Sequence, residues 1–106
     1  MPTLHICPLS QLHTTVTTAG ARSIITLLNA GTAVRRPAEV EPERHILIAI
    51  SDITEPMDGH ILPGAPDVAS LLAFVRQWDR RDPMVIHCFA GVSRSTAAAF
   101  ITACAL

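Results

Sequence analysis

Short runs of nearly continuous apolar residues are the feature that most constrains the fold of this chain. They lie at residues 4–7, 23–29, 45–51 and 84–87, and aliphatic side chains dominate them. Strands with apolar residues at consecutive positions are typical of parallel sheets, because helices cover both faces of such a sheet. We therefore expect four strands, with the run at 45–51 buried on both faces.

Segments with helical spacing separate these runs. A short helix is expected over residues 10–18, with Ser10 as its cap and Gly20 closing it. A second helix is expected over residues 66–80, and a third from residue 93 to the end of the chain, apolar nearly all round as a buried helix would be. The alternation predicts an α/β fold: one domain over residues 1–106 with a central, largely parallel sheet of four or five strands flanked by helices.

The composition excludes several classes of partner. Only 16% of the 106 residues are charged and the formal net charge is -1, which leaves no basic footprint for nucleic acid or for an anionic membrane. The first residues do not resemble a secretory signal, and no apolar run is long enough to span a membrane. Three cysteines and five histidines show neither disulfide nor metal-ligand spacing. We expect a cytoplasmic protein with reduced thiols and no cofactor or metal.

The stretch "VIHCFAGVSRST", residues 85–96, carries the chemistry. Cys88 ends an apolar run, Gly91 lies in the loop that follows, and Arg94 falls in the first turn of the next helix. Ligands bind beyond the carboxyl ends of parallel strands, and a helix start offers free amides to an anion. The same position lowers the pKa of a cysteine, and an arginine can hold two phosphate oxygens at once. A buried structural cysteine beside a surface arginine is the alternative interpretation.

The segment "HCFAGVSRS" resembles the H-C-x5-R-[ST] signature of the cysteine-dependent protein tyrosine phosphatases. Its residues are most similar to those of the compact dual-specificity branch and its small bacterial relatives. The resemblance implies that Cys88 is the nucleophile that forms a phospho-cysteine, that Arg94 binds the phosphoryl oxygens, and that Ser95 assists departure of the thiolate. It implies that His87 orders the loop and keeps the thiolate ionised. The backbone amides that would cradle the phosphate belong to Phe89, Ala90, Gly91, Val92, Ser93 and Arg94.

The family also uses an aspartate upstream of the cysteine as general acid. Asp52 directly follows the run at 45–51, where compact phosphatases carry this residue, and we favour it. Asp58, in "PMDGH", is the alternative general acid, and Glu55 is a weaker third candidate. Aspartates in such settings also serve as turn residues, so the aspartate that is not the acid is expected to have that role.

The resemblance implies hydrolysis of phosphotyrosine monoesters in proteins, with phosphoserine and phosphothreonine as further candidate substrates. The loop lacks lysine, which disfavours polyphosphorylated lipid or inositol substrates. Two other functions remain open. Rhodanese-like sulfurtransferases also use a cysteine loop that ends in arginine, and a phosphatase fold without turnover would be a module that binds phosphorylated residues.

Other residues are expected to be structural. Cys7, Cys104, Phe74 and Trp78 are predicted core residues, with a reversible disulfide between Cys7 and Cys88 as a further hypothesis that requires the first strand to end near the loop. Compact phosphatases continue past the helix that follows the arginine, whereas residues 99–106 carry no polar face and no capping residue. We therefore expect the domain to be incomplete at its C-terminus, with the last helices missing.

Overall fold

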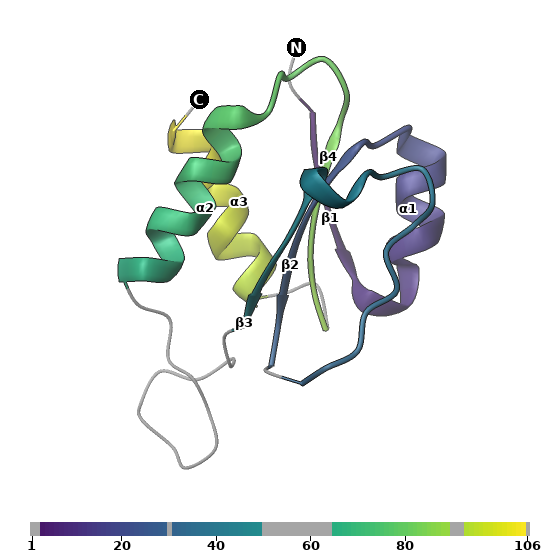
Figure 1. The fold of residues 1–106 in the computed structure, drawn as a ribbon, viewed down its shortest axis with the longest axis horizontal. Coiled ribbons are helices and arrows are strands. Elements are labelled where there is room, and N and C mark those ends of the chain that lie inside the picture. The colour runs from purple at the N-terminus through teal and green to yellow at the C-terminus, as the bar shows by residue number, and fades with distance from the viewer. Residues whose placement is uncertain (1–2, 30, 50–64, 90–92, 106) are drawn as a thin grey trace.

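The computed structural model describes residues 3–29, 31–49, 65–89 and 93–105 (Figure 1). Two short 3₁₀ turns, Leu9–Gln11 and Pro42–Arg44, precede α1 and β3 respectively. The strands and helices, in chain order, are β1 (Leu4–Pro8), α1 (Leu12–Ala19), β2 (Ser23–Leu28), β3 (His45–Ala49), α2 (Ala65–Gln77), β4 (Met84–Cys88) and α3 (Ser93–Ala105).

The four strands form one sheet in the order β1-β4-β2-β3, and every neighbouring pair is parallel. The register places Ile86 of β4 opposite Ile6 of β1 on one side and opposite Ile25 of β2 on the other. All residues of β2 and β4 are buried, which the continuous apolar runs predicted. The α/β prediction with a parallel four-stranded sheet is confirmed.

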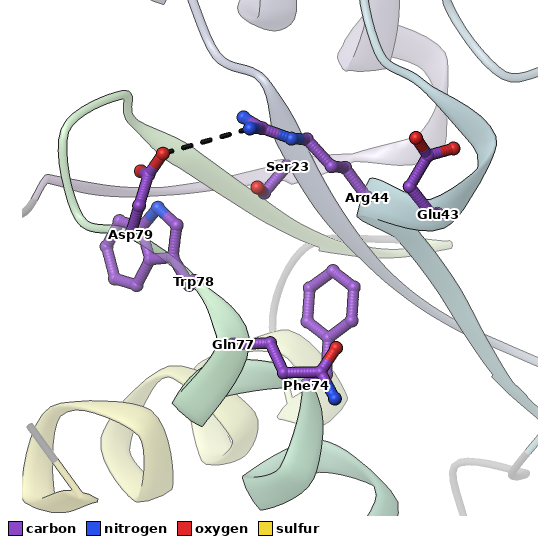
Figure 2. A pocket seen from close by; sticks show the side chains of 7 residues that line it. All are labelled: Ser23, Glu43, Arg44, Phe74, Gln77, Trp78 and Asp79. Atoms are coloured by element: carbon purple, nitrogen blue, oxygen red, sulfur yellow. Dashed lines mark ion pairs between the residues drawn. The ribbon is translucent and has the colours of Figure 1, made fainter.

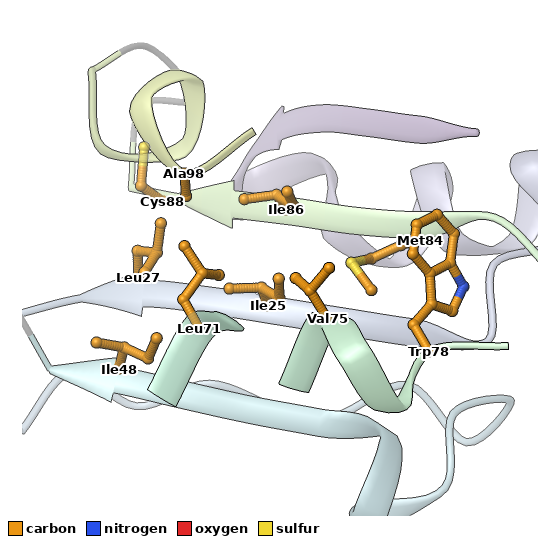
Figure 3. Close-up of a cluster of buried hydrophobic side chains, with 10 residues drawn as sticks. All are labelled: Ile25, Leu27, Ile48, Leu71, Val75, Trp78, Met84, Ile86, Cys88 and Ala98. Atoms are coloured by element: carbon orange, nitrogen blue, oxygen red, sulfur yellow. The ribbon is translucent and has the colours of Figure 1, made fainter. Parts of the chain in front are cut away.

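Helices cover both faces of the sheet. In Figure 1, α2 and α3 lie side by side against one face, and α1 lies against the other face over β1 and β4. The core under α2 and α3 is drawn in Figure 3, where Cys88 lies at the end of β4. The larger members of that cluster are Ile25, Leu27, Ile48, Leu71, Val75, Trp78, Met84 and Ile86. The core under α1 contains Cys7, Leu12, Val16, Ala21, Ile24, Val40 and Val85.

Two expectations about burial are wrong. The run that begins at His45 forms the edge strand β3, and Leu47 is 50% exposed because it points to the face where α1 packs over β1 and β4. Ile50 and Ser51, the end of the expected strand, lie outside the described residues. Helix α3 rests on the sheet with one side only, so Phe100 is 71% exposed and Cys104 is exposed rather than part of the core.

The starts and ends of the helices differ in detail from the sequence predictions. Ser10 lies in a 3₁₀ turn and is not a cap, because α1 begins one turn later behind Gln11, which makes no side-chain capping hydrogen bond. Gly20 does close α1, with a left-handed φ of 69°. Helix α2 ends at Gln77 rather than near residue 80; the next residue, Trp78, donates its amide to the carbonyl of Val75 and its indole N–H to the carbonyl of Asp82 at 2.9 Å.

Two leucines test the layout of the core. Leu12 on α1 is 1% exposed, whereas Leu47 on the edge strand is half exposed. We expect Leu12→Ala to lower the free energy of unfolding by about 2–5 kcal/mol, because it removes buried methyl groups and leaves a cavity. The same change at Leu47 is expected to cost about 1 kcal/mol or less. Urea unfolding of both variants measures the difference, and equal losses would contradict the assignment of β3 to the sheet edge.

Candidate functional site

All four strands run in the same direction, so their carboxyl ends meet at one edge of the sheet. Cys88 ends β4 there, and Asn29 directly follows β2. The amide of Leu9 donates to the carbonyl of Phe89 at 3.1 Å, which joins the end of β1 to the start of the loop after β4. A small pocket opens at this edge, and Leu28, Asn29, Thr32, Phe89 and Arg94 line it. The topology therefore brings together residues that are far apart in the sequence.

Cys88 and Ser95 form the buried part of this site. The Cys88 side chain points to the face that carries α2 and α3, and its Sγ lies 3.3 Å from the hydroxyl oxygen of Ser95. Ser95 is in the first turn of α3 and is fully buried. A serine hydroxyl can accept a hydrogen bond from a thiol and donate one to a thiolate. The pair can therefore stabilise the sulfur in either protonation state.

Arg94 reaches the pocket from the first turn of α3. One of its terminal nitrogens donates to the side-chain oxygen of Asn29 at 2.9 Å. This contact holds the guanidinium over the carboxyl end of β2, beside the exposed ring of Phe89, which is 66% exposed. The sequence did not single out Asn29, although its place directly after an apolar run is the signal that would have found it.

His87 lies on the opposite face of the sheet from Cys88, because successive side chains of a strand alternate. It is fully buried, and its Nε2 lies 2.7 Å from the hydroxyl of Thr26 on β2. Burial, and to a smaller extent the neighbouring His45, lowers the pKa of His87 to about 4, against an opposing effect of the Cys88 backbone. The imidazole is therefore neutral at pH 7, and it acts on the site through hydrogen bonds rather than through a positive charge.

Cys7 lies near the end of β1, close to the site, but its side chain is on the opposite face of the sheet from that of Cys88. It lies opposite His87 in the register of β1 and β4, and its side chain packs with Leu12 and Val16 under α1. Burial raises the pKa of the Cys7 thiol, a hydrogen bond with Thr15 lowers it, and the nearby Cys88 adds to the rise. The backbone of the sheet thus separates the two sulfur atoms, and the geometry does not favour the hypothetical Cys7–Cys88 disulfide.

Several predicted site residues lie outside the described residues. They are Asp52, Glu55 and Asp58, together with Ala90, Gly91 and Val92 of the loop. Within residues 3–29, 31–49, 65–89 and 93–105, no group of three His, Cys, Asp or Glu side chains converges on a possible metal site. In the same ranges, no helix combines the length and the apolar character needed to cross a membrane.

A second pocket lies at the opposite, amino-terminal edge of the sheet (Figure 2). Arg44 points across it toward Asp79, with 3.8 Å between the charged groups, and lies 3.9 Å from the carboxylate of Asp82. Two carboxylates thus offset the charge of this arginine, which makes the pocket unsuitable for an anion. The remaining lining residues are Ser23, Glu43, Phe74, Gln77 and Trp78.

Both the sequence and the fold of this chain are similar to those of protein tyrosine phosphatases. Residues 56–106, nearly half of the chain, match the family model described as protein-tyrosine phosphatase. The fold is similar to the crystal structure of the Cydia pomonella PTP-2 phosphatase, with a TM-score of 0.69 and 19% sequence identity over 93% of this chain. That alignment covers 63% of the other chain, so the present chain spans less than two thirds of it. No curated protein matches the chain.

The buried imidazole of His87 predicts a loss of stability in acid. Its folded pKa of about 4 lies below the ordinary 6.5, so the unfolded chain binds the proton first as the pH falls. We expect the free energy of unfolding to be unaffected by this group above pH 6.5 and to fall by about 3 kcal/mol between pH 6.5 and pH 4. Urea unfolding across this range measures the loss, and the difference from His87→Gln isolates it from the titration of carboxylates. Parallel profiles for the two chains would contradict the assignment.

Proposed function

We propose that this chain, whose residues 56–106 match the protein-tyrosine phosphatase family model, hydrolyses phosphate monoesters through a covalent phospho-cysteine at Cys88. The observation that carries the proposal is the buried contact of 3.3 Å between the Cys88 sulfur and the Ser95 hydroxyl. Arg94 stands beside it at the start of α3, where free backbone amides and the helix dipole favour an anion. A nucleophile and an anion site at one helix start are what phosphoryl transfer to a thiolate requires.

The first chemical step forms a bond between sulfur and phosphorus. The Cys88 thiolate attacks the phosphorus atom, the bond to the ester oxygen breaks, and that oxygen takes a proton from the general acid, Asp52 or alternatively Asp58. The guanidinium of Arg94 and the amides of residues 89–94 stabilise the charge on the non-bridging oxygens. The leaving alcohol or phenol then departs, and the phosphoryl group remains on sulfur.

The second step returns the enzyme to its starting state. The same aspartate, now ionised, accepts a proton from water, whose oxygen attacks the phosphorus atom and displaces the thiolate as inorganic phosphate forms. Ser95 donates its hydroxyl hydrogen to the departing sulfur, for which its position in the first turn of α3 is suitable. Rhodanese-like sulfurtransferases usually lack a serine or threonine after the arginine of the loop, so the Cys88–Ser95 contact favours hydrolysis over sulfur transfer.

The pocket suggests the class of substrate. Its rim combines the exposed aromatic ring of Phe89 with the uncharged Asn29 and Thr32, and Arg94 supplies its cationic group. Such a rim suits a singly phosphorylated aromatic side chain better than a polyphosphate. We propose phosphotyrosine in proteins as the substrate, with phosphoserine and phosphothreonine as further substrates, and a cytoplasmic location in which the thiols stay reduced. A module that binds phosphorylated residues without turnover is the second candidate function.

Replacing the nucleophile separates the two candidates. We expect Cys88→Ser to lower kcat for hydrolysis of an aryl phosphate by roughly 10⁴-fold or more, because the covalent intermediate cannot form. Cys104→Ser, at an exposed cysteine on α3, is the matched control and is expected to keep the wild-type rate. Release of phosphate measures both rates. Equal rates for wild type and Cys88→Ser would contradict the phosphatase proposal, and phosphopeptide binding without turnover would support the binding module.

The pH profile identifies the general acid. We expect Asp52→Asn to lower kcat by about 10²- to 10⁴-fold and to remove the basic limb of the profile, because no group then protonates the leaving oxygen. Asp58→Asn serves as the matched comparison and is expected to keep both limbs. The measurement is hydrolysis of an aryl phosphate with a poor leaving group from pH 4 to pH 9. Loss of the basic limb in Asp58→Asn alone would assign the acid to Asp58.

A further inference from the structure

Asn29 directly follows β2 and begins a tight turn that fixes its backbone. The amide of Thr32 donates to the carbonyl of Asn29 at 3.1 Å, and Gly31 has a left-handed φ of 83°. The third residue of a type II turn has such a φ, which glycine adopts without strain. The buried Leu28 anchors the start of the turn in the sheet. The side chain of Asn29 therefore leaves a well-defined position at the rim of the pocket that it shares with Arg94.

The Asn29 amide holds the guanidinium of Arg94 by one of its two terminal nitrogens. Nη1 of Arg94 donates to Oδ1 of Asn29 at 2.9 Å, and this bond joins parts of the chain that lie 65 residues apart. A guanidinium has only donors, so the amide oxygen and not the amide nitrogen must face it. An arginine binds a phosphoryl group best through two N–H groups on one edge. With Nη1 directed at β2, the edge that suits a phosphoryl group is the one formed by Nε and Nη2.

An amide fixes a guanidinium without bringing a counter-charge of its own. Arg44, at the other edge of the sheet, shows the contrast, because its guanidinium lies 3.8 Å from a carboxylate oxygen of Asp79 (Figure 2) and 3.9 Å from one of Asp82. Carboxylates at such distances offset the positive charge of an arginine. The oxygen of Asn29 carries only the partial charge of an amide, so the charge of Arg94 is not cancelled by this contact.

We propose that Asn29 is a positioning residue, a neutral tether that fixes the Arg94 guanidinium at the anion site without competing with the phosphoryl group for its charge. The proposal deepens the proposed function and rests on it. An arginine side chain has several rotatable bonds, and ordering it on binding lowers affinity. A tether that orders Arg94 before the substrate arrives reduces this loss and holds the N–H groups where charge develops in the transition state.

Two substitutions at Asn29 separate the tether from its neutrality. Asn29→Ala removes the oxygen, so we expect kcat/KM for an aryl phosphate to fall and the Kd of inorganic phosphate to rise, each by about 10-fold at any ionic strength. Asn29→Asp keeps an oxygen but adds a negative charge beside the anion site, so its loss of phosphate affinity is expected to shrink as salt screens that charge. Initial rates and calorimetric titration measure both effects. Gln77→Ala removes an amide at the opposite edge of the sheet and is the matched control, with wild-type values expected.

A double variant shows whether Asn29 acts through Arg94. If it does, Asn29→Ala causes no further loss of kcat/KM when it is added to Arg94→Ala, because the group that it positions is already absent. A further loss as large as that in the wild-type background would overturn the positioning role. Phosphate affinity of Asn29→Asp equal to that of wild type at low salt would overturn the role of neutrality.

Binding and turnover are measured separately, so failure of this proposal differs from failure of the proposed function. A wild-type chain that binds phosphate more tightly than Asn29→Ala but does not hydrolyse an aryl phosphate would overturn the phosphatase proposal alone. Hydrolysis at the same kcat/KM, and phosphate binding with the same Kd, in wild type and in Asn29→Ala would overturn the positioning role alone.

Discussion

The parallel pairing of β4 with both β1 and β2 is the constraint on which the rest of this structure depends. Every residue of β4 is buried, so the strand is stable only in the interior of a sheet with helices on both faces. Its register then fixes Cys88 level with Pro8 and sets the end of β2 beside it. Cys88, the arginine at the start of α3 and the asparagine after β2 meet because three strands end together.

Alternation along β4 divides the site between two environments. Cys88 points toward α2 and α3 and meets the Ser95 hydroxyl there, whereas His87 points toward α1 and meets Thr26. The imidazole therefore influences the sulfur across one peptide unit and without direct contact. Because burial keeps His87 neutral, the charge that opposes a phosphoryl group in the proposed mechanism comes from Arg94 and from the helix start.

Much of the fold and part of the site could be predicted from the sequence. Continuous apolar runs identified the strands, and the spacing from Cys88 to Arg94 identified the loop between strand and helix. Burial of β3 could not be read from its residues, because an edge strand and a central strand carry the same apolar pattern and only the strand order distinguishes them. The row of hydrogen-bonded side chains from His87 through Thr26 to His45 depends on the order β4-β2-β3, which differs from the order in the chain. The two candidate acids, Asp52 and Asp58, lie outside the described residues.

The buried row is costly for the fold, which is an argument about its purpose. A threonine hydroxyl and an imidazole lose solvation when they are buried, and the hydrogen bonds of the row offset this loss only in part, because Nδ1 of His87 has no hydrogen-bond partner among the described residues. A buried polar group without a partner costs on the order of 1–3 kcal/mol in proteins. Apolar residues at both positions would continue the pattern of β2 and β4 and remove that cost. The imidazole also weakens the folded state in acid, because its pKa is about 4. Polar groups that break the local pattern at a stability cost are expected where a site needs them, and this row ends one residue from the proposed nucleophile.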